Sequence, residues 1–423
     1  MLKILEKIIN IKNKSKKDIQ FEKIKNSPEI VKLFECFSKS DSQAEIRFVG
    51  GFVRKVLTDQ NFDDVDLAVN LNPEEVKNIL IHNNINFYET GIEHGTLTAI
   101  INNKKFEITS LRNDLITDGR HAKVQYTKIW SEDASRRDFT INSIYADLDG
   151  NIYDPNNGKT DLNNGIVRFI GEPEKRIKED YLRIIRYLRF FSIYSSEAHS
   201  NEVCKAISKN ISGIKNLSKE RIIDELKKIF LSGCVCNISK DDFSLKIFNL
   251  IFPELKNITI LKKFDNHLEN LLNEQDFILF LSLILIDETD DTEYFLYKYN
   301  LSNIEKKRIK FLKGYYPQIS SKEFFSEKNL SKIHYIHGDP FIIDIINFKI
   351  LKSRKISTKL MEIKKKFTNK QKPIFPVKAQ YLIDNFNLKE GKDLGLKLKK
   401  LENIWMENNF QISNKQIVDN ISD

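Results

Sequence analysis

Apolar residues follow two different spacings along this chain, and the change between them divides it into two parts. From Ala44 to about Ile170, short apolar runs alternate with polar turns, which indicates mixed α and β structure. The runs 96–101 and 105–110, separated by the polar turn 102–104, predict a β-hairpin. We therefore expect a sheet in the first part of the chain.

After Glu172 and Pro173, apolar residues recur at helical spacing to the end of the chain. Residues 1–40 also predict one or two amphipathic helices, which lead into the first strand. In 218–231, Ser218 is a suitable N-terminal cap for a single apolar stripe of Ile222, Ile223, Leu226, Ile229 and Phe230. The pattern predicts an α+β fold, in which a head with a mixed sheet precedes an all-helical remainder.

The composition is that of a soluble globular protein with a modest excess of positive charge. Hydrophobic residues make up 41% and charged residues 30% of the 423 positions, and the formal net charge is +9. This excess suits a polyanionic partner held by its phosphates. A genome that favours lysine would produce the same excess, and the richness in Ile, Lys and Asn supports that explanation. Charge alone is therefore weak support for a nucleic-acid partner.

Cysteine spacing and hydropathy favour a reducing, aqueous compartment. The longest apolar run, 277–286, is too short to span a bilayer and predicts a buried helix. Residues 1–17 lack the apolar core of a signal peptide. None of the four cysteines has the spacing of a zinc site: Cys36, Cys204, Cys234 and Cys236. We expect a cytoplasmic protein that does not interact with a membrane.

A candidate metal site lies where an apolar run ends in two glycines and two aspartates follow. Without side chains, Gly50 and Gly51 let backbone N–H groups approach a phosphate at the start of a predicted helix, 52–57. Asp64 and Asp66 would project from one face of a strand, where two carboxylates repel each other unless a cation lies between them. Such oxygen ligands suit Mg²⁺ bound together with substrate phosphates. Each motif alone is common in ordinary turns and caps, so their order and spacing predict the nucleotidyl-transfer site.

Two further groups could complete this site. Glu107 lies on the returning hairpin strand and would join the carboxylates if that strand neighbours the two aspartates; the alternative is a surface cross-strand charge. Arg136 and Arg137 carry guanidinium groups that match phosphate oxygens, and Asp138 would hold an arginine or a sugar hydroxyl. This second group also fits a helix start with Asp138 near its N-terminus, and the two interpretations are compatible.

A ladder of charged residues repeats every three positions along a helix predicted at 180–193. Because positions three apart share a helix face, one acid and three arginines form a polar ridge: Asp180, Arg183, Arg186 and Arg189. Aspartate accepts from an exocyclic amine and arginine donates to ring nitrogens and carbonyls, so a rigid Asp/Arg pair could read a base edge without a template. A salt-bridge ladder would have the same spacing, but three arginines with one acid leave positive charge for a triphosphate.

Together these residues resemble the class II CCA-adding tRNA nucleotidyltransferases and their relatives, the bacterial poly(A) polymerases. The resemblance is strong from about Ala44 to Arg189, includes 90–96, and extends to Leu217–Arg221 before it fades; 373–410 looks like the family's C-terminal stretch. It implies a polymerase-β-like nucleotidyltransferase head, followed by an all-α neck, body and tail. The implied parts are an N-terminal helical segment, the head, the neck, and the body with the tail: 1–40, 41–170, 171–235 and 236–423.

The resemblance also implies roles for individual residues. Asp64 and Asp66 would bind Mg²⁺, with Glu107 as a further catalytic carboxylate. Asp180 and Arg183 would select C or A by its base edge. The full set of nucleotide-binding residues would be Gly50, Gly51, Arg54, Arg136, Arg137, Asp138, Asp180, Arg183, Arg186 and Arg189. In addition, a hinge would link head and neck at 154–158, and a flexible loop at about 112–133 would support the switch from C to A.

The implied function is template-independent addition of CCA to the 3′ end of tRNA from CTP and ATP, through two-metal phosphoryl transfer that releases pyrophosphate. The alternatives are a poly(A) polymerase, or an enzyme that adds only CC or only A. A remote alternative is a non-catalytic RNA-binding protein, which loss of a metal aspartate would signal. The length, and the absence of a long basic extension after Asp423, favour CCA addition.

The sequence departs from the family's usual pattern at one position of the glycine motif. The family usually has Asp or Asn after the arginine of that motif, and this chain has Lys55. This change leaves the metal ligands in place but alters the hydrogen bonding around them. A histidine–aspartate phosphohydrolase signature is also lacking, since His334, His337 and Asp339 do not have its spacing.

Overall fold

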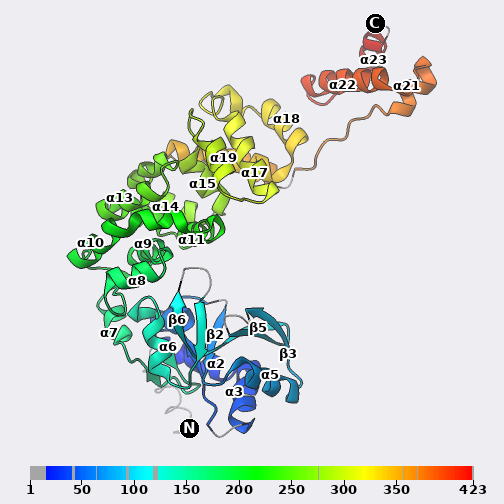
Figure 1. The fold of residues 1–423 in the computed structure, drawn as a ribbon. Coiled ribbons are helices and arrows are strands. Elements are labelled where there is room, and N and C mark those ends of the chain that lie inside the picture. The colour runs from blue at the N-terminus through cyan, green and yellow to red at the C-terminus, as the bar shows by residue number, and fades with distance from the viewer. Residues whose placement is uncertain are drawn as a thin grey trace, which may run out of the picture. The chain divides into compact units, whose positions relative to one another are not determined.

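The computed structural model of the chain describes residues 16–40, 43–62, 64–91, 95–117, 122–274, 276–355, 357–368 and 370–421. Parts of several expectations therefore lie outside the described residues: 1–15 of the N-terminal segment, 92–94 of the motif 90–96, 118–121 of the loop 112–133, and single positions or pairs within the predicted parts 41–170 and 236–423. The chain forms two compact units (Figure 1), Met1–Ile229 with Asp241–Ile251, and Phe230–Lys240 with Phe252–Asp423. The predicted boundaries at 40, 170 and 235 remain predictions.

The first unit contains a seven-stranded mixed sheet in the order β3-β4-β5-β2-β1-β8-β9. The β2–β5 pair is parallel and the other pairs described in this sheet are antiparallel. The strands are β1 (Ile46–Val49), β2 (Val65–Val69), β3 (Asn86–Gly91), β4 (Thr96–Ile101), β5 (Lys104–Ser110), β8 (Tyr145–Ala146) and β9 (Ile152–Tyr153). A separate two-stranded sheet pairs β6 (Arg112–Thr117) with β7 (Ala122–Tyr126).

Helices cover the sheet and continue the first unit beyond it. They are α2 (Lys16–Lys25), α3 (Pro28–Ser40), α4 (Gly51–Leu57), α5 (Pro73–His82), α6 (Trp130–Arg136), α7 (Gly158–Asn163), α8 (Pro173–Glu179), α9 (Leu182–Tyr194), α10 (Asn201–Asn210), α11 (Lys219–Leu231) and α13 (Asp242–Ile251). Two short 3₁₀ helices are η2 (Thr140–Asn142) and η3 (Ile211–Asn216).

The second unit is helical in its described part. Its elements are α12 (Val235–Lys240), η4 (Lys256–Lys263), α14 (Asn266–Asn273), α15 (Phe277–Leu285), α16 (Asp291–Lys298), α17 (Asn303–Tyr315), η5 (Glu323–Phe325), α18 (Glu327–His337), α19 (Asp339–Ser353), α20 (Thr358–Thr368), α21 (Ala379–Phe386), α22 (Lys392–Glu407) and α23 (Asn414–Ile421). The predicted α+β class, with a mixed-sheet head before an all-helical remainder, is confirmed.

Local sequence signals account for several of these elements. The predicted hairpin is β4 and β5, and its turn residues Asn102 and Asn103 both have left-handed backbone, with φ of 49° and 63°. The Ser218 side chain accepts a hydrogen bond from the backbone N–H of Arg221 (3.4 Å), and all five apolar residues of the α11 stripe are buried. The hairpin and the capped helix are therefore confirmed.

The apolar run 277–286 forms α15, in which every residue is buried. Asp276 caps this helix by accepting from the backbone N–H groups of Ile278 (3.0 Å) and Leu279 (3.1 Å). The predicted buried helix is therefore confirmed. In the part of the chain that the structure describes, no helix combines the length and the apolar character needed to cross a bilayer.

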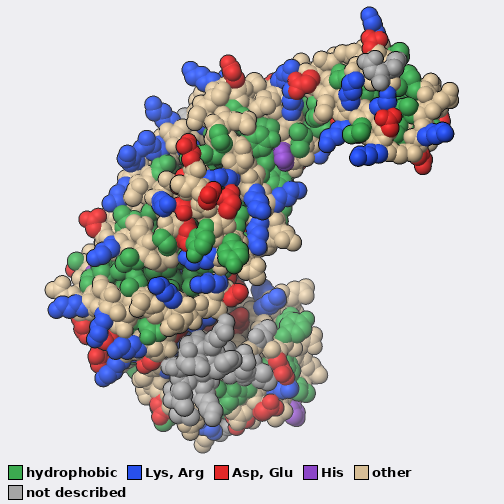
Figure 2. All heavy atoms as spheres, turned by 45° about the horizontal axis from the view of Figure 1, so that its top comes forward, with side chains coloured by type: hydrophobic (Ala, Val, Ile, Leu, Met, Phe, Trp, Pro, Cys, Tyr) green, Lys and Arg blue, Asp and Glu red, His purple; other side chains and the backbone are tan. Residues whose placement is uncertain are grey.

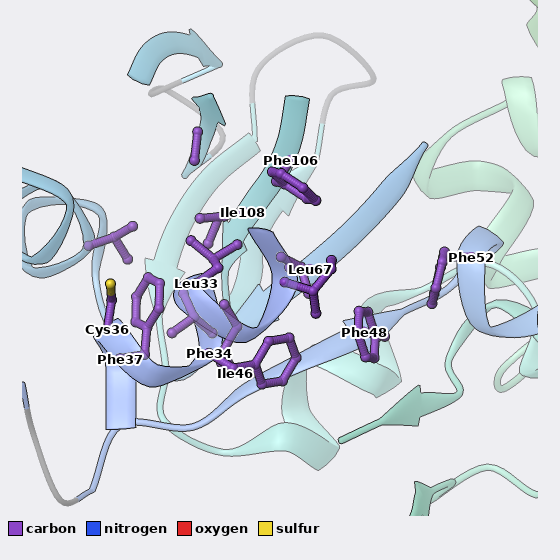
Figure 3. Packing of buried hydrophobic residues seen from close by; sticks show 14 of the residues in the cluster. Leu33, Phe34, Cys36, Phe37, Ile46, Phe48, Phe52, Leu67, Phe106 and Ile108 are labelled. Carbon is purple, nitrogen blue, oxygen red and sulfur yellow. The ribbon is translucent and has the colours of Figure 1, made fainter. Parts of the chain in front are cut away.

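The core of the head fixes which face of the sheet carries the charged residues. Figure 3 shows apolar side chains of α3 packed against those of β1, β2 and β5, and Phe34 lies 5.0 Å from Phe48 between ring centroids. Leu67 of β2 and Ile108 of β5 belong to this core. Because side chains alternate along a strand, the residues between these apolar positions project from the opposite face. Asp66 and Glu107 occupy such positions on adjacent strands.

A close contact between α7 and η2 supports the segment that follows Asp138. A Cβ added to Gly158 would lie 2.0 Å from the carbonyl oxygen of Thr140. The Asp154 carboxylate accepts hydrogen bonds from the backbone N–H groups of Gly158 and Lys159, both at 2.8 Å. The absence of a side chain at Gly158 is therefore a packing requirement.

We predict that Gly158→Ala destabilises the protein by about 1–3 kcal/mol, because the new methyl group meets a backbone carbonyl that cannot move aside cheaply. In an unobstructed helix the same change would stabilise by about 1 kcal/mol, so the sign of the effect tests the contact. Urea unfolding measures it, with Lys159→Ala at the exposed neighbouring position as control. A Gly158→Ala protein as stable as the wild type would show that this contact does not constrain the fold.

Candidate active site

The glycine turn brings the start of α4 beside the aspartates of β2. Gly50 has φ of 62°, a left-handed conformation that favours glycine, and α4 begins at Gly51. A Cβ added to Gly51 would lie 3.5 Å from Oδ2 of Asp66. The helix start and the carboxylate therefore face one another, as the sequence predicted for a site that binds phosphate and metal together.

Asp66 is the centre of a group of acidic residues. It is half-buried on β2 and pairs in register with Glu107 of β5, while Asp64 is exposed just before the strand begins at Val65. Burial raises the pKa of Asp66, and the negative charges of Glu107 and Asp64 raise it further, against smaller opposing effects of Arg137 and Lys55. The strand of Glu107 thus neighbours the aspartates, as expected, although Glu107 itself is exposed.

These carboxylates suit a hard divalent cation. The residues described here contain no group of three or more His, Cys, Asp and Glu side chains already close enough to hold a metal. Mg²⁺ usually binds through one or two carboxylates and completes its shell with water and substrate phosphates. Asp64 and Asp66 fit that mode, because a cation would relieve the repulsion that raises the pKa of Asp66.

The adjacent arginines lie at the end of α6, where one buried carboxylate holds both. Asp133 bonds to Arg136 at 2.6 Å and to Arg137 at 3.0 Å, and accepts from the hydroxyl of Tyr145 at 2.7 Å. Burial would raise the pKa of Asp133, but the two guanidinium groups and the tyrosine hold this pKa well below its usual range. The predicted helix start near Asp138 is present only as the three-residue η2, which begins at Thr140, after α6 has ended at Arg136.

Asp138 connects the head to α9. It is buried, accepts from Nε of Arg186 at 2.7 Å, and accepts from the Asn142 side-chain amide at 2.8 Å. Asn142 in turn accepts from Arg54, whose guanidinium lies 4.8 Å from the ring centroid of Phe190. Burial raises the pKa of Asp138, while Arg186 and Asn142 outweigh that effect and lower it to about 2. The prediction that Asp138 holds an arginine is confirmed.

The charged ladder of α9 differs from its prediction in its partners. Asp180 precedes the helix, which begins at Leu182, and its Oδ2 bonds to Arg221 of α11 at 2.7 Å. Arg183 bonds to Glu179 at 2.5 Å, Arg186 to Asp138 at 2.6 Å, and Arg189 to the buried Glu225 at 2.6 Å. The expectation of one acid for three arginines is therefore wrong, because each arginine bonds to a carboxylate other than Asp180, and Arg183 shares Glu179 with Arg176.

Nearly all predicted site residues line one cavity of about 790 Å³, which lies entirely within the first unit. Glu107 is the exception. The predicted residues in the lining are Gly50, Gly51, Arg54, Asp64, Asp66, Arg136, Arg137, Asp138, Asp180, Arg183, Arg186 and Arg189. The cavity thus brings together the predicted metal ligands, phosphate-binding residues and base-reading residues, whose roles remain predictions.

The predicted site set did not include several residues of the lining and the carboxylates that support it. Lining residues outside that set include Lys55, Arg112, Asn142, Arg221 and Lys228, and the supporting carboxylates are Asp133, Glu179 and Glu225. The spacing of Asp133 from the two arginines was a usable signal, since residues three and four apart meet on a helix. Glu225 lies 36 positions from Arg189, so no local pattern connects them.

Family models match two segments of the chain. Residues 46–168 match the poly A polymerase head domain, and residues 200–259 match a model described as the probable RNA and SrmB-binding site of polymerase A. The first match covers the glycine turn, the aspartates and the adjacent arginines.

Curated relatives extend the similarity over almost the whole chain. The mitochondrial CCA tRNA nucleotidyltransferase 1 of Mus musculus is 31% identical over 411 residues, covering 93% of this chain and 91% of the relative. The corresponding protein of Danio rerio is 44% identical over 207 residues, 48% of each chain. The CCA-adding enzyme of Staphylococcus epidermidis is 34% identical over 282 residues, covering 65% of this chain and 67% of the relative.

Solved structures share the fold at lower identity. A CCA-adding enzyme of Bacillus stearothermophilus in complex with CTP matches with a TM-score of 0.72 and 21% identity, over 90% of this chain and 94% of that one. A Thermotoga maritima CCA-adding enzyme complexed with tRNA matches with a TM-score of 0.60 and 18% identity, over 96% and 98% of the two chains. With the identity to the mouse protein over nearly its full length, these matches show that the chain belongs to the family of CCA-adding tRNA nucleotidyltransferases.

Proposed function

We propose that this protein adds CCA to the 3′ end of tRNA without a nucleic-acid template, using CTP, ATP and Mg²⁺. The observation that carries the proposal is the single cavity in which the carboxylates of Asp64 and Asp66 and the base-reading candidates Asp180 and Arg183 are gathered. Relatives over nearly the whole chain are named for the same activity. A nucleotide bound in this cavity would meet metal, phosphate-binding and base-reading groups at once.

The chain's own residues would position the triphosphate. The backbone at Gly50 and Gly51 allows close approach of a phosphate, and Arg54 adds a buried guanidinium held against Phe190. When bound by Asp64 and Asp66, Mg²⁺ would activate the tRNA 3′-hydroxyl and neutralise charge on the leaving pyrophosphate. Positioning of the reactants supplies most of the acceleration in phosphoryl transfer, so no covalent intermediate with the protein is required.

The base-reading groups are held in fixed orientations. Asp180 accepts from the backbone N–H of Leu182 (3.1 Å) and from Arg221, which aligns its carboxylate. Arg183 is buried and donates to Glu179 and to the carbonyl of Arg176 at 2.8 Å. Cytosine and adenine carry an exocyclic amine where uracil and guanine carry a carbonyl oxygen, so a carboxylate accepts from the first two and repels the others.

Binding of tRNA would rest on phosphate contacts and acceptor-stem shape, since the grooves of A-form RNA reveal little sequence. Figure 2 shows lysine and arginine side chains spread over the visible surface of the second unit. Lys365, Lys399 and Lys400 are exposed there, in two lysine clusters at 364–366 and 397–400. The affinity of lysine-cluster variants for tRNA would show whether these clusters contact RNA or only solvent.

A cytoplasmic location remains part of the proposal. The names of the animal relatives state a mitochondrial location, and those of the bacterial relatives state none. Fractionation of the source cells, with detection of the protein in each fraction, separates the two possibilities.

The activity is tested with a tRNA that lacks its last three nucleotides, supplied with CTP and ATP separately and together in the presence of Mg²⁺. We expect two C residues and one A, followed by a stop, when products are sized at single-nucleotide resolution. An Asp66→Ala protein should lose at least about 10³-fold of the rate, because a metal ligand supplies several kcal/mol of transition-state stabilisation, while still binding tRNA.

The other products discriminate between the alternatives. A lengthening ladder of A residues would make the protein a poly(A) polymerase, and a stop after CC, or addition of A alone, would make it a partial enzyme. No product from the wild type would favour an RNA-binding protein without catalysis. Asp290→Ala, at an exposed position of the second unit, controls for general effects of losing an aspartate.

We predict that Asp180→Ala lowers discrimination against UTP and GTP by about 10–100-fold, because a well-placed base contact contributes about 1–3 kcal/mol. Arg221→Met should lower it in the same direction but less, since it removes only the group that aligns Asp180. The measurement is kcat/KM for each of the four nucleotides, with Lys215→Met, an exposed change near α11, as control. Unchanged discrimination in Asp180→Ala would place base selection elsewhere.

A further inference from the structure

Lys55 lies one helical turn after Gly51 on α4, and residues four apart share a helix face. The position of Gly51 beside Asp66, 3.5 Å from an added Cβ to Oδ2, identifies that face as the one directed at the carboxylates. Lys55 is half-buried and lines the same cavity as Asp64 and Asp66. Its preceding neighbour Arg54 also reaches this point, with Nη2 3.9 Å from the added Cβ of Gly51, but its guanidinium is held by Asn142 and packs against Phe190.

The ammonium group of Lys55 is uncommitted where other cations of the cavity are paired. Over the described ranges, its side chain makes no hydrogen bond or ion pair, whereas Arg137, another cation of the lining, is bound to Asp133 at 3.0 Å. Asp64 and Asp66 likewise form no ion pair with a described residue. Among the described residues, Lys55 therefore brings to the cavity of these carboxylates a positive charge that no ion pair offsets.

The positive charge of Lys55 affects how strongly the carboxylates bind a divalent cation. A lysine ammonium is a compact point charge on a flexible stem, so it can approach the carboxylates or turn away from them. Lys55 lines the same cavity as both carboxylates, so its positive charge acts on them across that space. A divalent cation that enters the same space must overcome this positive charge by Coulomb repulsion. A nucleoside triphosphate would bring enough negative charge to outweigh the repulsion between Lys55 and the entering cation.

We propose that Lys55 is a built-in counter-cation of the Asp64 and Asp66 carboxylates, which weakens divalent-cation binding to the nucleotide-free protein and so couples metal entry to entry of the triphosphate. The use of this coupling rests on the proposed function. The predicted effect on metal binding concerns the nucleotide-free protein alone. It makes Lys55 a positioning residue for the metal, and Lys55 itself takes no part in the transfer reaction.

The test measures Mn²⁺ binding to the full-length, nucleotide-free protein by electron paramagnetic resonance of the free ion. Lys55→Met, which keeps the length of the side chain and removes its charge, should bind Mn²⁺ about tenfold more tightly, the effect expected of one nearby charge. Lys55→Arg should behave as the wild type. The control is Lys39→Met, an exposed lysine of α3 that is paired with Glu35 outside the cavity, and its affinity should not change.

Two controls tie the effect to the carboxylates and to the folded protein. Adding Asp66→Ala to Lys55→Met should abolish the tightened Mn²⁺ binding. The thermal midpoint of Lys55→Met should equal that of the wild type, because the side chain is half-buried and bonds to no described residue.

Equal Mn²⁺ affinities of the wild type and Lys55→Met would overturn the proposal, as would Mn²⁺ binding by neither. Weaker binding of CTP to Lys55→Met in EDTA, with unchanged Mn²⁺ affinity, would make Lys55 a phosphate ligand and would also overturn it. The measurement uses no tRNA and no turnover. Tighter Mn²⁺ binding in Lys55→Met would therefore uphold the role of Lys55 even if the protein failed to add CCA.

Discussion

Carboxylates within hydrogen-bond distance hold most of the arginines that line the cavity, because a guanidinium group removed from water is costly without a partner. Arg54 is held by Asn142 and Phe190 instead. Asp133 holds the two arginines at the end of α6, Asp138 holds Arg186, and Glu225 holds Arg189. The last two pairs join α9 to the head on one side and to α11 on the other. Helix α9 is thus positioned by buried ion pairs as much as by its apolar face. Removing one carboxylate would leave an uncompensated charge in the interior, which costs more than the pair contributes.

The groups proposed to act on substrate are the ones that this network leaves accessible. Asp66 is half-buried among like charges, so burial and repulsion both raise its pKa and favour a bound cation. Asp180 is half-buried too, but Arg221 and a backbone N–H fix its direction. Asp66 bonds to no cation of the described residues, which leaves its oxygens available to a metal. Asp180 is oriented and partly neutralised, which suits recognition of a neutral base amine.

The sequence predicts most of the fold because faces of helices and strands follow from local periodicity. The alternation around Asp66, the Asn102–Asn103 turn and the cap at Ser218 are all local, and the structure has each of them. The partners of the arginines could not be predicted in this way. Asp180 and Arg221 are 41 positions apart, and Asp138 and Arg186 are 48 apart. Spacing shows which residues share a face, but only the packed structure shows which charge each one meets.

The central claim is that one cavity binds the metal through Asp64 and Asp66 while Asp180 reads the base. A crystal structure of the protein with CTP and Mn²⁺, with anomalous scattering to locate the metal, tests this most directly. The account predicts an Mn²⁺ peak coordinated by both aspartates and by phosphate oxygens, with the exocyclic amine of cytosine donating to the Asp180 carboxylate. Mn²⁺ bound away from these aspartates, or a cytosine that contacts neither Asp180 nor Arg183, would contradict it.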